Sequence, residues 1–71
     1  MSKESKLLEI IAEILEVEVN EVNLDTQLDE DSWDSLAVVT FISEVDSNFD
    51  VVVSPSLVGG AETVKQLIDL V

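Results

Sequence analysis

Hydrophobic residues recur at helical spacing in three stretches of the chain, beginning with residues 3–16. In that stretch they share one face, and glutamates occupy the other: Leu7, Leu8, Ile11, Ile14 and Leu15 against Glu9, Glu13 and Glu16. This pattern predicts an amphipathic helix. Ser2 is suited to cap it, and Glu4 falls in the first turn, where the positive end of the helix dipole favours an acidic residue.

A second, more apolar helix is expected to begin at Ser35, with Asp34 as its N-cap, and to end near Phe49. Apolar side chains occupy most of its length: Leu36, Val38, Val39, Phe41, Ile42 and Val45. Because such a helix has two water-avoiding faces, we expect one to pack in the core and the other to be a candidate partner surface.

A short helix is predicted after Ser54 and Pro55, because serine suits the N-cap and proline suits the first helical position. It covers residues 56–58 and is stopped by the two glycines that follow. Thr63 then caps a last helix, whose apolar face is formed by Val64, Leu67, Ile68 and Val71.

Valine-rich segments connect these helices. Residues 17–22 are a β-branched and acidic run, for which a short strand is possible in isolation, but no partner strand is evident. We expect Val19 and Val22 to pack beneath the first helix. Residues 50–53, which include three consecutive valines, are interpreted as an extended connection.

The remaining connection, residues 23–34, is a long loop, and a compact domain tolerates such a loop when it is pinned or functional. Leu24 and Leu28 are expected to pin it to the core, while the polar residues around them face water. Trp33 is expected to form a lid on the core, since buried aromatic side chains are more common than ligand platforms.

Together these elements predict an all-α fold: a small four-helix bundle of three main helices plus one short helix, with the long loop between the first two helices. At 71 residues the chain is treated as one domain, residues 1–71, near the size at which a single core gives marginal stability. Hydrophobic residues make up 46% of it, which argues against disorder despite the high charge.

The charge is strongly negative. Sixteen acidic residues against three lysines give a formal net charge of −13, and no cation lies between Leu7 and Val64. Such a surface repels nucleic acids and anionic membranes and attracts basic protein patches, so we expect no nucleic-acid or membrane partner. Neither a secretory signal nor a segment of membrane-spanning length is visible, and a cytoplasmic location is expected.

The chain has no cysteine and no histidine. This excludes disulfides, thiolate nucleophiles, zinc sites of the usual type and histidine-based catalysis. Because Lys65 is the only base outside the N-terminal end, Ser35 has no neighbour in the sequence to activate it. We therefore predict no catalytic residue and no metal site, and a protein that is not an enzyme.

With Asp34-Ser35-Leu36 at the start of its second helix, the chain resembles the acyl carrier protein family. The resemblance extends over essentially the whole chain, including Phe49-Asp50 and Thr63-Val64. It implies that Ser35 is the attachment point of a 4′-phosphopantetheine arm, transferred from coenzyme A by a separate phosphopantetheinyl transferase. The thiol of the arm would carry an acyl or aminoacyl group as a thioester. Asp34 would cap the helix and present charge, and Leu36 would be an apolar contact for partners.

The sequence departs from the family pattern around this motif. Ser32 stands where a glycine is usual, and Trp33 is bulkier than is typical. In the second helix Ala37, Val38, Thr40 and Ser43 dilute the carboxylates that fatty-acid carriers display. This favours a specialised pathway, such as polyketide or peptide assembly, over general fatty-acid synthesis.

The implied partners are acyl-activating, acyltransferase or synthase enzymes with basic or apolar docking patches, and the carrier itself is expected to be a monomer. An acyl chain held between the helices would also suit the resemblance. The same apolar side chains are needed for the core, and we favour that role for them.

The alternative is an acidic interaction or cation-binding module without covalent cargo. Asp29 and Asp46 each begin an acidic stretch that superficially resembles a calcium loop. An EF-hand loop requires glycine at its sixth position and glutamate at its twelfth, and neither stretch has them.

Overall fold

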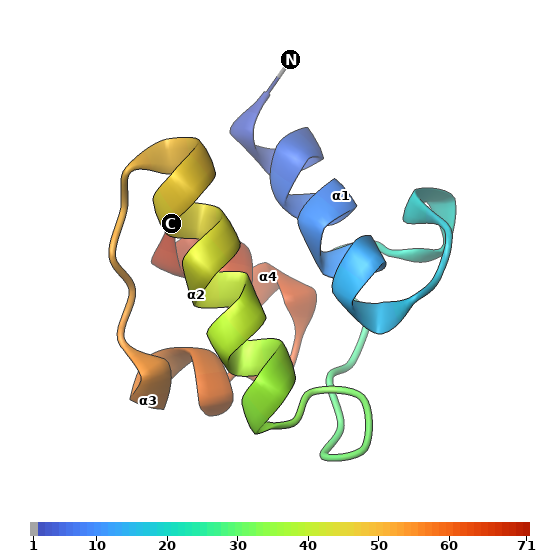
Figure 1. Ribbon diagram of the computed structural model, residues 1–71. Helices are drawn as coiled ribbons and strands as arrows, with labels where there is room; N and C mark the ends of the chain where they lie inside the picture. The colour runs from blue at the N-terminus through green and yellow to red at the C-terminus, as the bar shows by residue number, and fades with distance from the viewer. Residues whose placement is uncertain (1) are drawn as a thin grey trace.

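The computed structural model describes residues 2–71 and confirms the predicted all-α bundle (Figure 1). Two long helices, two short ones and one 3-10 turn follow each other along the chain: α1 (Lys3–Leu15), η1 (Val19–Glu21), α2 (Ser35–Phe49), α3 (Pro55–Gly59) and α4 (Val64–Leu70). In Figure 1, α1 and α2 run in opposite directions, α4 lies behind α2, and α3 lies near the beginning of α2.

The two long helices begin and end where local chemistry predicts. The Ser2 hydroxyl accepts a hydrogen bond from the backbone N–H of Ser5 at 3.1 Å, which caps α1. Both helices stop at an acidic residue in the left-handed conformation, Glu16 with φ 60° and Asp50 with φ 56°. A non-glycine residue reaches this conformation at a cost of about 1 kcal/mol. At the end of α1 local hydrogen bonds offset it: the N–H groups of Glu16 and Val17 donate to the carbonyls of Glu13 and Ala12 at 3.2 and 3.0 Å.

The core forms where one face of each helix meets the others. Phe41 and Val45 of α2 are fully buried, together with residues from α1, α3 and α4: Leu7, Ile11, Val58, Val64 and Leu67. No buried side-chain nitrogen or oxygen lacks a hydrogen-bond partner among the residues that the structure describes. The two ends of the described chain are joined by the Lys3 ammonium, which donates to the carbonyl oxygen of Val71 at 2.9 Å.

The segment after α1 departs from the sequence prediction. Val22 is buried, as expected, but Val19 is 45% exposed, so its predicted packing beneath α1 is wrong. The backbone here forms a tight 3-10 turn, in which the N–H of Glu21 donates to the carbonyl of Glu18 at 2.9 Å. This turn, and not an extended segment, directs the side chain of Val19 outward.

The long loop is held in part as predicted, and also in a way that the sequence did not indicate. Leu24 and Leu28 are both half-buried, and Leu28 packs against the core. In addition, the loop pairs through its backbone with the segment before α4, as an isolated antiparallel bridge between Gln27 and Thr63. The hydrogen bonds run from Leu28 N to Glu62 O at 2.8 Å, from Val64 N to Thr26 O at 3.0 Å and from Lys65 N to Leu24 O at 3.1 Å. They hold the loop against α4.

The short helices also lie where expected. Ser54 and Thr63 occupy the N-cap positions of α3 and α4, but neither side chain makes a capping hydrogen bond within the described part of the chain. Residues 50–54 have no regular structure, as predicted for an extended connection, and Val53 is buried there.

Candidate functional site

The first turn of α2 is fixed by its N-cap. The side chain of Asp34 accepts a hydrogen bond from the backbone N–H of Ala37 at 2.9 Å, and its carbonyl accepts from the N–H of Val38 at 3.0 Å. Ser35 is the first helical residue, and it is exposed. The structure thus places a serine hydroxyl at the solvent-facing N-terminus of a helix of 15 residues.

Leu36, the third residue of the predicted motif, is 74% exposed. Its carbonyl oxygen accepts a hydrogen bond from the Thr40 hydroxyl at 2.9 Å, so the backbone is held while the apolar side chain stays in water. Val39, one turn after Ser35, is 62% exposed. An apolar surface therefore borders the serine on α2, as the sequence predicts.

Trp33 anchors the loop immediately before the motif. Its side chain is only 6% exposed, and its indole N–H donates to the carbonyl oxygen of Val58 in α3 at 3.1 Å. Its ring meets the ring of Phe41 edge-on, with centroids 5.7 Å apart. Trp33 is thus the lid that the sequence predicts, and it also ties the start of α2 to α3.

A turn upstream of Trp33 is held by Asp29, a role that the sequence analysis did not predict for this residue. One carboxylate oxygen of Asp29 accepts from the N–H of Asp31 at 3.1 Å, from the N–H of Ser32 at 2.8 Å and from the Ser32 hydroxyl at 2.9 Å. These hydrogen bonds, the one from the Ser32 N–H first, lower the pKa of Asp29 below its ordinary value. The spacing of aspartate and serine three residues apart is a turn signal that could have identified it.

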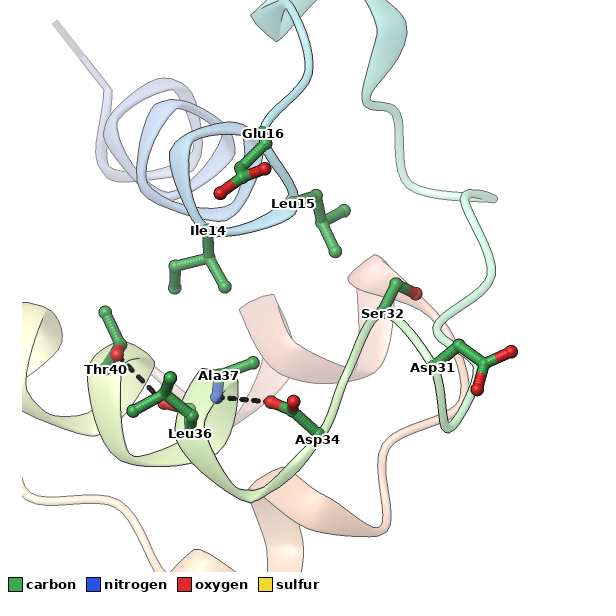
Figure 2. A pocket seen from close by; sticks show the side chains of 9 residues that line it. All are labelled: Ile14, Leu15, Glu16, Asp31, Ser32, Asp34, Leu36, Ala37 and Thr40. Atoms are coloured by element: carbon green, nitrogen blue, oxygen red, sulfur yellow. Dashed lines mark hydrogen bonds between the residues drawn. The ribbon is translucent and has the colours of Figure 1, made fainter.

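Two hollows flank the beginning of α2. One, of about 380 Å³, lies between the end of α1 and the first turns of α2; Figure 2 shows Ile14 and Leu15 extending from α1 toward α2 there. The other, of about 570 Å³, lies between α2 and α3 and includes the serine; its walls are formed by Glu30, Trp33, Asp34, Ser35, Val38, Val39, Pro55 and Gly59. Only the second hollow adjoins Ser35.

The chemistry available at the site is limited. The chain contains no histidine or cysteine, and Lys65 of α4 forms an ion pair with Asp69 at 3.7 Å. Among residues 2–71 no three acidic side chains are gathered closely enough to hold a metal ion. The site therefore offers an exposed serine hydroxyl, and the carboxylate next to it in the chain, that of Asp34, is engaged as the N-cap of α2.

The family model for the phosphopantetheine attachment site matches residues 5–71. The chain belongs to this family. A domain of this family is a carrier to which 4′-phosphopantetheine is covalently attached, so the cofactor expected from the sequence is confirmed. Comparison with curated proteins and with solved structures gave no significant match. In this phosphopantetheine-attachment domain, no helix of the described residues is long and apolar enough to cross a membrane.

Proposed function

We propose that this protein is an acyl or aminoacyl carrier whose 4′-phosphopantetheine arm is attached to Ser35. The observation that carries the proposal is the exposed Ser35 hydroxyl at the capped beginning of α2, in a domain whose family accepts this arm. When attached, the arm supplies the thiol that holds an acyl group as a thioester, which this cysteine-free chain otherwise lacks.

The local structure fits a phosphodiester on Ser35. The free backbone N–H groups and the dipole at the N-terminus of α2 favour an anion by about 0.3 to 1 kcal/mol at an exposed position. The carboxylate of Asp34 opposes the negative charge, but it is already engaged with the N–H of Ala37. Its contribution is to fix the first turn of the helix, and with it the backbone at Ser35.

Attachment requires the Ser35 oxygen to lose its proton as its bond to phosphorus forms. The carboxylate next to Ser35, that of Asp34, is already engaged with the N–H of Ala37, so in this proposal the proton passes to a base of the phosphopantetheinyl transferase. In this proposal the chain is the substrate of its modifying enzyme and is not an enzyme. The hollow between α2 and α3 adjoins Ser35 and has apolar walls at Val38 and Val39.

The exposed face of α2 supports a specialised pathway, such as polyketide or peptide assembly, over general fatty-acid synthesis. Leu36 and Val39 are exposed apolar side chains, and Thr40 and Ser43 are exposed and uncharged. Partner enzymes would therefore dock through apolar contacts as well as through basic patches, which are complementary to the net charge of −13. The same charge opposes association of two copies, which supports a monomer, and we place the carrier in the cytoplasm with its transferase.

Intact-mass measurement after incubation with coenzyme A and a broad-specificity phosphopantetheinyl transferase tests the attachment. We expect one arm on the unaltered protein, none on Ser35→Ala, and one on the matched control Ser43→Ala, which removes another exposed serine of α2. A folded protein that gains no arm, or an arm retained by Ser35→Ala, would contradict the proposal. The first outcome would favour an acidic interaction or cation-binding module without covalent cargo.

The pathway is tested by exchange of the carrier. Enzymes of a fatty-acid synthase should load and elongate an acyl group on this protein more slowly than on a generic fatty-acid carrier, because α2 displays fewer carboxylates. Equal rates on the two carriers would exclude a dedicated pathway.

A further inference from the structure

The turn from Asp29 to Ser32 is held by a single carboxylate oxygen. That oxygen receives the two backbone N–H groups of Asp31 and Ser32 and the hydroxyl of Ser32, all within 3.1 Å. Hydrogen bonds to an ionised carboxylate are stronger than those between neutral groups. The side chain of Asp29 thus fixes the backbone of two residues, Asp31 and Ser32, that are exposed to water.

This turn is connected directly to Ser35. The carbonyl of Asp29 accepts a hydrogen bond from the backbone N–H of Trp33 at 2.7 Å. This bond joins the turn to the residue whose indole is buried in the core. Trp33 is in turn fixed by the carbonyl of Val58, and Asp34 caps the first turn of α2. Every residue from 29 to 34 except Glu30 therefore takes part in a contact that determines how the chain arrives at Ser35.

The arrangement also explains how serine is accommodated at position 32. The resemblance to acyl carrier proteins implies a glycine there, whose backbone is free to adopt unusual conformations. Here the Ser32 backbone N–H and hydroxyl both donate to Asp29, so the approach to α2 is set by hydrogen bonds. The lowered pKa of Asp29 is the electrostatic counterpart of the same contacts.

We propose that Asp29 is a positioning residue for attachment of the arm: its carboxylate holds the turn before α2 so that the Ser35 hydroxyl is presented to the transferase in one orientation. The inference rests on the proposed function of Ser35. Without Asp29 the chain before Ser35 samples several conformations, and ordering it on binding weakens the encounter with the transferase. The acceptance of a proton from Ser35 by the transferase is unaffected.

Asp29→Ala and the matched control Asp31→Ala test this role. Both remove one carboxylate from the same loop, but no hydrogen bond to the Asp31 side chain is present in the structure of residues 2–71. With the carrier concentration corrected for its folded fraction, we expect Asp29→Ala to raise the transferase KM by roughly threefold to tenfold at unchanged kcat. Asp31→Ala should leave both constants unchanged. Asp29→Asn, which keeps a side-chain oxygen acceptor, should restore part of the loss.

Amide hydrogen exchange separates local positioning from general destabilisation. In Asp29→Ala the amides of Ser32 and Trp33 should exchange faster while those of Ile11 and Val45, in the cores of α1 and α2, keep their protection. If Asp29→Ala is modified with the KM of the unaltered protein, or if Asp31→Ala shows the same increase, Asp29 has no positioning role. If the unaltered protein gains no arm, the proposed function fails and this inference fails with it.

Discussion

Asp34 links the proposed function to stability, because the residue beside Ser35 is also the N-cap of α2. Asp34→Ala removes the acceptor for the Ala37 N–H and should lower the free energy of unfolding by about 1 kcal/mol. Asp34→Asn should stay within a few tenths of a kcal/mol of the unaltered protein, since asparagine is an equally good cap. Urea denaturation of the three proteins measures this. An equal loss in both variants would show that charge, and not capping, is what matters at this position.

Trp33 contributes both packing and a hydrogen bond. Trp33→Phe keeps an aromatic ring against Phe41 but leaves the carbonyl of Val58 without its indole donor and opens space in the core. We expect a loss of about 1 to 3 kcal/mol in the free energy of unfolding, from an unpaired buried acceptor and a small cavity. Thermal and urea denaturation would measure it, and a loss under about 0.5 kcal/mol would mean that water reaches the Val58 carbonyl.

Asp29 should make the free energy of unfolding decrease as the pH falls into the acid range. Its pKa is lowered on folding from an ordinary value of 3.8, chiefly by the hydrogen bond from the Ser32 N–H. The stabilisation it gives is therefore present above pH 3.8 and is lost as the pH falls through the lower folded-state pKa. Asp29→Asn should be less stable than its charge-matched control Asp31→Asn at neutral pH, and urea denaturation should show this difference shrinking in acid. A difference that is constant down to about pH 2 would contradict this assignment.

Among the elements, α3 allows a test with two adjacent glycines. A Cβ added at Gly59 would lie 3.9 Å from the side chain of Val38, an ordinary contact, whereas one at Gly60 would lie 3.2 Å from the carbonyl oxygen of Ser56. Gly59→Ala should therefore raise the free energy of unfolding by about 0.5 to 1 kcal/mol, through the higher helix propensity of alanine. Gly60→Ala should not, because the backbone must shift. Equal effects in urea denaturation would show that α3 adjusts freely.

The helices were predictable because their signals are local. Apolar spacing and an N-cap, such as Ser2 for α1 or Asp34 for α2, lie within a few residues of each other in the sequence. The bridge between Gln27 and Thr63 joins residues far apart in the chain through backbone groups that carry no side-chain signature, so no pattern predicted it. The prediction for Val19 was wrong because the 3-10 turn, which the sequence pattern did not indicate, leaves Val19 exposed while Val22 is buried.

In the candidate site, too, some residues could be predicted from the sequence and others could not. Asp34, Ser35 and Leu36 form a contiguous motif, and the structure places them together at the beginning of α2, with the leucine exposed. Asp29 lies six residues before Ser35, within a run of acidic residues that all look alike in the sequence. What distinguishes it is which carboxylate turns back onto the Ser32 N–H, and only the folded backbone determines that.

At the scale of the whole molecule, the small dimensions determine how strongly the acidic residues repel each other. The described chain measures 28 × 26 × 18 Å and carries the whole formal net charge of −13. The Debye length is about 30 Å at 0.01 M ionic strength, so in dilute buffer every carboxylate is repelled by every other. The ion pair between Lys65 and Asp69 is exposed and contributes little against this repulsion.

Added salt should therefore stabilise the fold. Between about 0.01 M and 0.5 M ionic strength the Debye length falls below about 8 Å, and repulsion between opposite faces is screened. We expect the melting temperature to rise by about 5 °C, which corresponds to about 1 kcal/mol in a domain of this size. Magnesium should act at lower concentration than sodium, because the potential around so many carboxylates attracts a divalent cation more strongly.

A matched variant shows whether this rise comes from repulsion. Glu9 and Glu13 lie one turn apart on the exposed face of α1, where like charges destabilise a helix. Converting both to glutamine should raise the melting temperature in dilute buffer and flatten its dependence on salt. If the variant and the unaltered protein respond to salt equally, the rise reflects general salting-out of apolar surface. The acidic residues would then be retained for attraction to partners, at no measurable cost to the fold.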